Sequence, residues 1–283
     1  MPVDPYVTAA EFAAHPTYLE LDNLRQDVTE PAAQTAVLTN LLLASSDWAD
    51  GECNQPLGAH VMTRKSRARV DAYGNLQLVA SHWPIIAVTA VAYGPSPTAL
   101  TPVLDLSSVW VEADRMALLP ISAPRSTGAG LFVNWTYIAG RVAALTNESA
   151  DEGATSLMVT NPLGILPDQS YRLWEPGSEE TVTVASDYVP PPWSPVPQPT
   201  EIPLAAPTRH AHGEGFSVSG FTADARLAVI NYTASVLMRP DTTAEDEFPD
   251  NNMSSTRDKD SRPTGLGLVK EARRILASLA AVS

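Results

Sequence analysis

The sequence has little cysteine, little positive charge and no long apolar run. Cys53 is the single cysteine among 283 residues, which excludes an intrachain disulfide. Eighteen Lys and Arg stand against 32 Asp and Glu, so the formal net charge is −14 and the chain repels nucleic acid on average. No run of roughly eighteen apolar residues is present, and residues 1–8 lack a basic and an apolar region. We therefore expect neither a membrane span nor a secretion signal.

The motifs of common enzyme classes are also absent. Nothing matches G-x-S-x-G, a P-loop, H-E-x-x-H or G-x-G-x-x-G. The acidic residues Glu179, Glu180 and Asp224 have no spacing that predicts two opposed carboxylates, and Cys53 has no partner pattern. We predict that the protein is not an enzyme and that it uses no cofactor.

One histidine pair invites a metal interpretation. His210 and His212 would share a face if they lay on a strand, and Glu214 follows them. A closed metal site needs three or four ligands, and no cysteine cluster or second histidine pair supplies the others. An ordinary polar loop is the better interpretation, so we predict no metal.

Helical signals stand near both ends of the chain. Thr8 and Glu11 form a capping-box pattern, which predicts a short helix that stops before Pro16. A second helix is expected from about residue 29 to residue 50, with Gly51 as its C-cap. Its apolar residues recur at helical spacing: Val37, Leu38, Leu41, Leu42 and Trp48. A third helix should begin at Thr222 and end at Pro240.

The middle of the chain predicts strands. The strand candidates are residues 61–71, 76–79, 85–93, 109–111, 116–119 and 131–138. Residues 141–216 have the pattern of a separate all-β module, with strands expected at 154–160, 171–175 and 179–186. Residues 190–207 hold eight prolines among eighteen residues, which predicts an extended loop rather than a helix or a central strand.

The C-terminal part predicts a helix on a tether. Residues 241–265 are polar and acidic, so we expect a flexible segment there. Residues 266–281 have apolar positions at helical spacing, but a helix this short is marginal in water. It must dock either on its own domain or on another subunit. The predicted fold class is α+β: a small helical core with a β-rich segment, formed by residues 1–140 and 217–240, an inserted all-β module and a tethered C-terminal helix.

Two features could contact a partner. The basic cluster comprises Arg64, Lys65, Arg67 and Arg69, of which the last three share one face of a strand. It could contact DNA in a channel, acidic residues of a neighbouring subunit, or only solvent. Trp193 lies in the proline-rich loop, so we expect it to be exposed and to be a candidate partner contact. We expect the other β-segment tryptophans, Trp83, Trp110 and Trp135, in the core.

Several short motifs occur in a recognisable order. After two N-terminal helices come Trp83-Pro84-Ile85-Ile86-Ala87-Val88, Val109-Trp110-Val111-Glu112, the run from Leu131 to Ala139-Gly140, and the helix Ala223-Asp224-Ala225-Arg226-Leu227-Ala228-Val229-Ile230. The opening Tyr6-Val7-Thr8 with Glu11-Phe12, the pair of motifs Trp48-Ala49-Asp50 and Cys53-Asn54-Gln55-Pro56-Leu57, and the closing run from Gly267 to Leu276 belong to the same pattern. In this order the chain resembles the head-to-tail adaptor (head-completion) family of long-tailed double-stranded DNA phages, in its actinobacteriophage-like members. The resemblance covers roughly residues 1–140 and 217–283.

The resemblance implies a role in the virion. It implies a ring of twelve copies beneath the portal protein, at the head–tail interface, with DNA passing through non-specifically and assembly in the host cytoplasm. It also implies that the C-terminal segment binds the portal. On this sequence the matching apolar residues are Leu268, Val269, Ala272, Ile275 and Leu276. Compact members of the family lack the module at residues 141–216.

Two alternatives remain open. The chain could be a tail-side or stopper connector component, in which residues 141–216 bind the next ring. It could also belong to a different class, a carbohydrate-binding protein that uses the β-module as its sugar site. The second alternative requires exposed, coplanar tryptophans.

Overall fold

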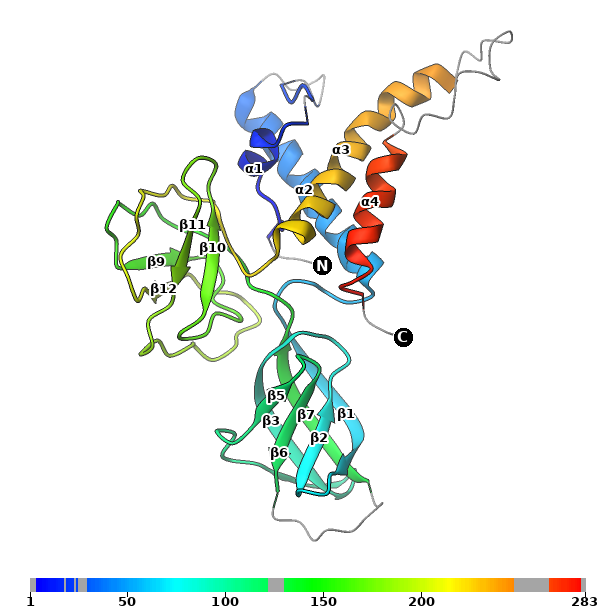
Figure 1. The fold of residues 1–283 in the computed structure, drawn as a ribbon, viewed down its shortest axis with the longest axis vertical. Helices are drawn as coiled ribbons and strands as arrows, with labels where there is room; N and C mark the ends of the chain where they lie inside the picture. Colours follow the sequence, from blue (N-terminus) through cyan, green and yellow to red (C-terminus); the bar gives the residue numbers. More distant parts are fainter. Residues whose placement is uncertain are drawn as a thin grey trace.

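Three bodies meet near the centre of the computed structural model (Figure 1). The structure describes residues 4–17, 19–22, 24, 30–121, 130–246 and 265–280. One body is helical, one is a seven-stranded antiparallel sheet, and one is a small β-barrel. The predicted α+β class is confirmed. None of the described helices is long and apolar enough to cross a membrane.

The helical body joins the two ends of the chain. It contains α1 (Ala9–Ala14), α2 (Pro31–Cys53), α3 (Ala223–Asp246) and α4 (Leu266–Leu276), with α3 and α4 packed side by side against α2 (Figure 1). The predicted capping box is present, because the Glu11 amide donates to Thr8 Oγ1 at 3.3 Å and the Thr8 amide donates to Glu11 Oε2 at 2.8 Å. Phe12, Leu42, Ala228 and Leu276 are among the residues that form its apolar core.

Two predicted helix ends are wrong. Gly51 lies inside α2, which ends at Cys53, and the C-cap is Asn54 in the left-handed conformation with φ of 52°, a conformation that Asn tolerates. Pro240 lies inside α3, which continues to Asp246. A proline removes one backbone hydrogen bond and strains one turn, at a cost of about 3 kcal/mol, so it does not always stop a helix. Residues 241–246 of the predicted tether are therefore helical, and its remainder up to residue 264 lies outside the described residues.

The seven-stranded sheet folds into two layers. Its strands are β1 (His60–Val70), β2 (Asn75–Val79), β3 (Ile85–Ser96), β4 (Ala99–Pro102), β5 (Trp110–Glu112), β6 (Met116–Pro120) and β7 (Leu131–Ala139), in the order β4-β3-β7-β1-β2-β6-β5. The long strand β1 pairs with β7 from His60 to Ala68 but with β2 only at Arg69 and Val70. The sheet bends there, and the two layers enclose one core that includes Leu76, Leu119, Val133, Trp135 and Tyr137.

The β-module is a closed barrel. Its strands are β8 (Ala143–Leu145), β9 (Ser156–Val159), β10 (Ser170–Trp174), β11 (Glu180–Thr183), β12 (Thr200–Pro203) and β13 (Ser217–Ser219). The sheets β11-β10-β13-β8 and β12-β9 are joined by two bridges, between Thr146 and Val159 and between Val184 and Leu204. These bridges close the strands around a separate core that includes Leu157, Leu173, Val182, Ile202 and Val218.

Strand β12 corrects the prediction for residues 190–207. It lies within this proline-rich stretch, pairs with β9, and ends at Pro203. Pro203 has no N–H to donate, but its carbonyl accepts from the Ala185 amide at 2.9 Å. The Leu204 amide supplies the next bond, to the Thr155 carbonyl at 2.8 Å. The predicted extended loop is therefore interrupted by β12 and comprises residues 190–199 and 205–207.

The chain crossings between the bodies form a tight junction. The Tyr6 hydroxyl donates to Asp50 Oδ1 at 2.7 Å, and the Gly58 amide donates to the Tyr6 hydroxyl at 2.9 Å. Gly58 also forms a parallel bridge with Arg141, just beyond Gly140. Gly140 has φ of 98°, and a Cβ there would lie 2.3 Å from the Gly58 carbonyl oxygen. Only glycine fits at the point where the sheet passes into the barrel.

Candidate functional site

The basic cluster forms a patch on one face of β1. Lys65, Arg67 and Arg69 are exposed, whereas Arg64 points to the opposite side and donates to the Val79 carbonyl at 2.6 Å. The predicted shared face of Lys65, Arg67 and Arg69 is confirmed. These three side chains are called the basic face from here on.

The neighbours of the basic face are neutral. Lys65 lies opposite Asn134 of β7, and Arg67 lies opposite Phe132, whose ring centroid is 4.6 Å from the guanidinium carbon. None of β1, β3, β4 and β7 contains an Asp or a Glu. Accordingly, none of the three cations forms an ion pair with any residue that the structure describes.

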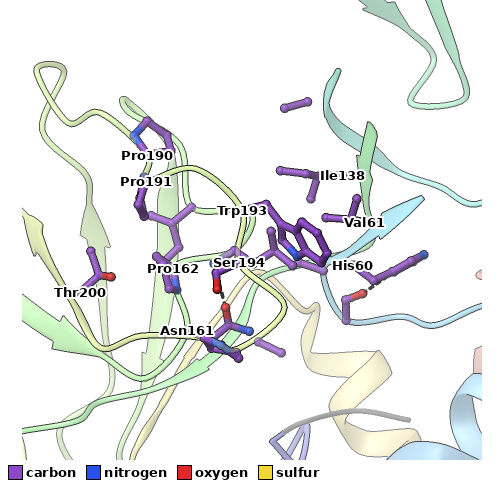
Figure 2. Close-up of a pocket in the computed structure, with 18 of the residues that line it drawn as sticks. His60, Val61, Ile138, Asn161, Pro162, Pro190, Pro191, Trp193, Ser194 and Thr200 are labelled. Atoms are coloured by element: carbon purple, nitrogen blue, oxygen red, sulfur yellow. Dashed lines mark hydrogen bonds between the residues drawn. The ribbon is translucent and has the colours of Figure 1, made fainter. Parts of the chain in front are cut away.

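A cavity lies where the barrel faces the other two bodies. Its volume is about 860 Å³, and its lining includes Val61 and Ile138 of the sheet, Leu163 of the barrel, and the proline-rich loop. Figure 2 shows Trp193 projecting from that loop toward Val61 and Ile138, with His60 beside it. Trp193 is 55% exposed, so its predicted exposure is confirmed. The cavity lies at one end of the outer sheet face, because its wall residue Val61 is on the same strand and the same side as Lys65.

Burial shifts the pKa values of titratable groups in and beside the cavity toward their neutral forms. Burial raises the pKa of Asp4, although Thr160 donates a hydrogen bond to its carboxylate at 3.3 Å. Burial likewise raises the pKa of Asp50. His60 Nε2 lies 2.8 Å from His82 Nδ1, so one ring donates a hydrogen bond to the other, and burial lowers the pKa of both. The arrangement suits the binding of an apolar group with hydrogen-bond donors.

Catalytic geometry is not evident in the part of the chain that the structure describes. The rings of His60, His82 and His212 contact another histidine, carboxylates or a backbone carbonyl, and no described Ser, Thr or Cys side chain hydrogen-bonds to these three rings. Cys53 is buried, and burial raises its pKa to about 12, which keeps it a thiol. Its Sγ lies 3.6 Å from the Leu276 carbonyl oxygen.

His212 belongs to a buried cluster that sequence reasoning missed. Its Nδ1 lies 2.7 Å from Glu175 Oε2 and its Nε2 lies 2.7 Å from Glu180 Oε1. Burial acts to raise the pKa of Glu180, but hydrogen bonds from His212 and from the Arg209 and His210 amides hold it below its usual value. Glu175 and Glu180 are close in the sequence, but His212 is separated from Glu180 by 32 positions, so no short motif marks the three side chains.

This cluster also bears on the metal question. Both ring nitrogens of His212 are bonded to carboxylates, and His210 is exposed. Among the described residues no group of three or more His, Cys, Asp or Glu has the arrangement of a metal site. The cluster instead joins β10, β11 and the segment before β13 within the barrel.

The C-terminal helix is packed on its own chain. Ala272 and Leu276 are 0% and 1% exposed in the helical core, where Leu268 and Ile275 also pack. Gln55 Nε2 donates to the Leu279 carbonyl at 2.8 Å just after the helix. Of the two docking partners that the sequence left open, the structure shows the chain's own domain. The side chains of Ala272 and Leu276 are therefore covered by the chain's own helices in this conformation.

The tryptophans divide between the core and the surface. Trp135 is 1% exposed, as predicted, whereas Trp110 is 47% exposed because it lies on the edge strand β5. Trp83 is partly buried, and the guanidinium carbon of Arg115 lies 4.2 Å from the centroid of its indole ring. The core assignment is therefore correct for Trp135 and wrong for Trp110.

The surfaces described above are the basic face, the cavity and the exposed Trp193 loop. The loop forms part of the cavity wall, and the cavity lies at one end of the outer sheet face that carries the basic face. No protein-family model, no curated protein and no solved structure matches this chain.

Proposed function

We propose that this protein is a structural component of a phage virion, an adaptor ring between the portal and the tail that leaves a channel for DNA. The observation that carries the proposal is the basic face. Three exposed cations on a strongly acidic chain have no carboxylate partner among the described residues. A surface of this kind suits binding to another macromolecule better than chemistry on a small substrate.

The proline-rich loop supplies a second contact. Val189, Trp193 and Val196 are 82%, 55% and 63% exposed on one loop. Tryptophan is enriched among the residues that dominate binding energy at interfaces. Prolines restrict the loop before binding, which lowers the entropic cost of ordering it at an interface. We assign this loop to the contact with the portal or with the tail-side connector.

The packing of α4 changes how the C-terminal segment would bind the portal. Ala272 and Leu276 are covered by α2 and α3, so they contact a portal only if α4 leaves the core. Leu268, Val269 and Ile275 are only partly buried and remain candidates in the packed state. We therefore propose that the portal contact of α4 involves these three residues.

The proposal is tested by co-sedimentation of the purified chain with portal rings. Wild-type protein should sediment with the portal, and Trp193→Ala should weaken binding about tenfold or more, the effect expected of a central aromatic contact. Trp110→Ala is the matched control, because Trp110 is similarly exposed on a different body. Unchanged binding by Trp193→Ala would remove the loop from the interface.

Two further arms separate the alternatives. Binding to the tail-side connector without binding to the portal would favour the stopper role. Affinity for glycans that is lost in Trp193→Ala, without affinity for either virion partner, would favour the carbohydrate-binding role and contradict the proposal.

A further inference from the structure

Charge is divided unevenly between the bodies. Residues 60–140, which form the sheet body, carry six Lys and Arg and four Asp and Glu. Residues 141–216, which form the barrel, carry three Lys and Arg and ten Asp and Glu. One body of the chain is therefore weakly positive and its neighbour is strongly negative, so two copies attract one another when unlike bodies meet.

The positive charge has a defined location. Lys65, Arg67 and Arg69 extend in one row along the outer side of β1, and the strands beside them contribute Asn134, Phe132 and small residues to the same side. The three cations are exposed, and the neighbouring strands β3 and β7 contain no Asp or Glu. Regular hydrogen bonding to β7 from His60 to Ala68 holds the row in place.

The barrel presents a matching negative loop. Glu148, Asp151 and Glu152 are exposed within five residues of one another, and none of them forms an ion pair with a described residue. The loop is held firmly, because Ala150 and His212 exchange backbone hydrogen bonds of 2.8 and 2.7 Å. Thr208 Oγ1 also donates to the Asp151 carbonyl at 3.0 Å. These three carboxylates are called the acidic loop from here on.

We propose that the basic face of one copy docks on the acidic loop of a second copy. The two surfaces differ, so the contact is head-to-tail, and repetition of such a contact gives a ring if the rotation closes. The inference deepens the proposed adaptor ring and rests on it for the claim that the assembly closes. The contact itself requires only the two charged surfaces.

A second copy fits the basic face better than DNA. Proteins that bind phosphate backbones usually carry a larger basic patch, and the net charge of −14 opposes approach to a duplex. A neighbouring barrel offers three fixed carboxylates in a small area instead. Surface charge pairs contribute modestly to affinity, and their main effects are on specificity and association rate. The remaining affinity comes from the apolar surface buried around them.

The test measures self-association of the full chain by sedimentation velocity at low and at high salt. Two charge-reversed variants are compared with wild type: K65E/R67E/R69E and E148K/D151K/E152K. Wild type should self-associate, and raising the salt from about 50 to about 500 mM should weaken association because the Debye length falls from more than 10 Å to less than 5 Å. Each variant alone should self-associate at least about tenfold more weakly than wild type.

Mixing the two variants provides the decisive arm. In the mixture, the negative face of K65E/R67E/R69E can dock on the positive loop of E148K/D151K/E152K. The unchanged basic face of the second variant can dock on the unchanged acidic loop of the first. Both contacts join opposite charges, so association should return toward the wild-type level. Failure of the mixture to recover would contradict the pairing of these two surfaces. Equal association by wild type and both variants would also overturn it.

Controls distinguish the possible failures. Circular dichroism and thermal unfolding of both variants should match wild type, because all six side chains are exposed. Salt-sensitive binding of wild type to duplex DNA that is lost in K65E/R67E/R69E, without self-association, would reassign the basic face to phosphate. Self-association without portal binding would support this contact and contradict the adaptor role. Portal binding by a chain that never self-associates would support portal recognition and contradict this contact.

Discussion

The hydroxyl of Tyr6 donates to Asp50 at 2.7 Å, and through this bond the N-terminal segment is tied to α2 at the junction of the three bodies. The same Asp50 oxygen accepts from the Leu57 amide at 2.8 Å, and the Tyr6 hydroxyl accepts from the Gly58 amide. Burial raises the pKa of Tyr6 well above its usual value, so the hydroxyl stays protonated and keeps donating. The Tyr6 side chain thus helps to fix the segment around Gly58, through which the chain enters β1.

Removing this hydroxyl should destabilise the protein. Tyr6→Phe leaves the Gly58 amide without its acceptor and takes one donor from Asp50, at a cost of about 1–3 kcal/mol. Urea unfolding followed by tryptophan fluorescence measures the change. Tyr73→Phe is the matched control, because Tyr73 is 87% exposed and should change the stability little. Equal effects of the two substitutions would mean that the junction does not depend on the Tyr6 hydroxyl.

The buried Glu180 should make the barrel sensitive to acid. Its folded pKa lies below the usual 4.5, so the folded state binds this proton more weakly than the unfolded chain does. The stabilisation is fully present above about pH 4.5 and is lost as the pH falls through the folded pKa. Glu180→Gln should therefore lower stability at pH 7 by about 1–3 kcal/mol and lose less stability between pH 7 and pH 3.5 than wild type does.

The neighbouring residue gives the control for this pH dependence. Glu179 is exposed, so Glu179→Gln should keep the wild-type pH profile. Both profiles are measured by urea unfolding at a series of pH values. A Glu180→Gln profile that coincides with wild type would remove the His212 cluster as a source of acid sensitivity.

Packing of the C-terminal helix should support the helical body. Leu276 is 1% exposed, so Leu276→Ala should lower the free energy of unfolding by about 2–5 kcal/mol. Lys270→Ala on the exposed side of α4 should change it by less than about 0.5 kcal/mol. If Leu276→Ala is as stable as wild type in urea, α4 does not stay in the core in solution, and docking of this helix on another subunit regains support.

The crossing from sheet to barrel should not tolerate a side chain. Gly140→Ala places a methyl group against the Gly58 carbonyl oxygen, and the backbone must shift to make room. Gly153→Ala is the matched control, because Gly153 also has a positive φ but nothing within 4 Å of a Cβ. Thermal unfolding should show a clearly larger loss for Gly140→Ala, and equal losses would mean that only backbone strain matters there.

Local patterns predicted the elements well. The Thr8–Glu11 capping box, the alternation along β1 and the exposure of Trp193 each depend on neighbouring residues, and each is present. The predicted end of α3 was wrong because Pro240 lies inside the helix, which continues to Asp246 despite the cost of a proline there.

Long-range relationships were beyond the sequence patterns. The bridges at Thr146–Val159 and Val184–Leu204 close the barrel, but strand pairing across such distances leaves no local signal. The cluster around His212 unites residues 175, 180 and 212, so its members look unrelated in the sequence. The docking of α4 on α3 and α2 likewise could not be separated from docking on another subunit, because an amphipathic helix has the same pattern in both cases.

The most direct test of the central claim is electron microscopy of portal rings incubated with the purified protein. The account predicts a second ring of density, coaxial with the portal and open along its axis, in class averages of the mixture but not of the portal alone. Portal rings without added density, under conditions where the protein is folded and in excess, would contradict the adaptor role.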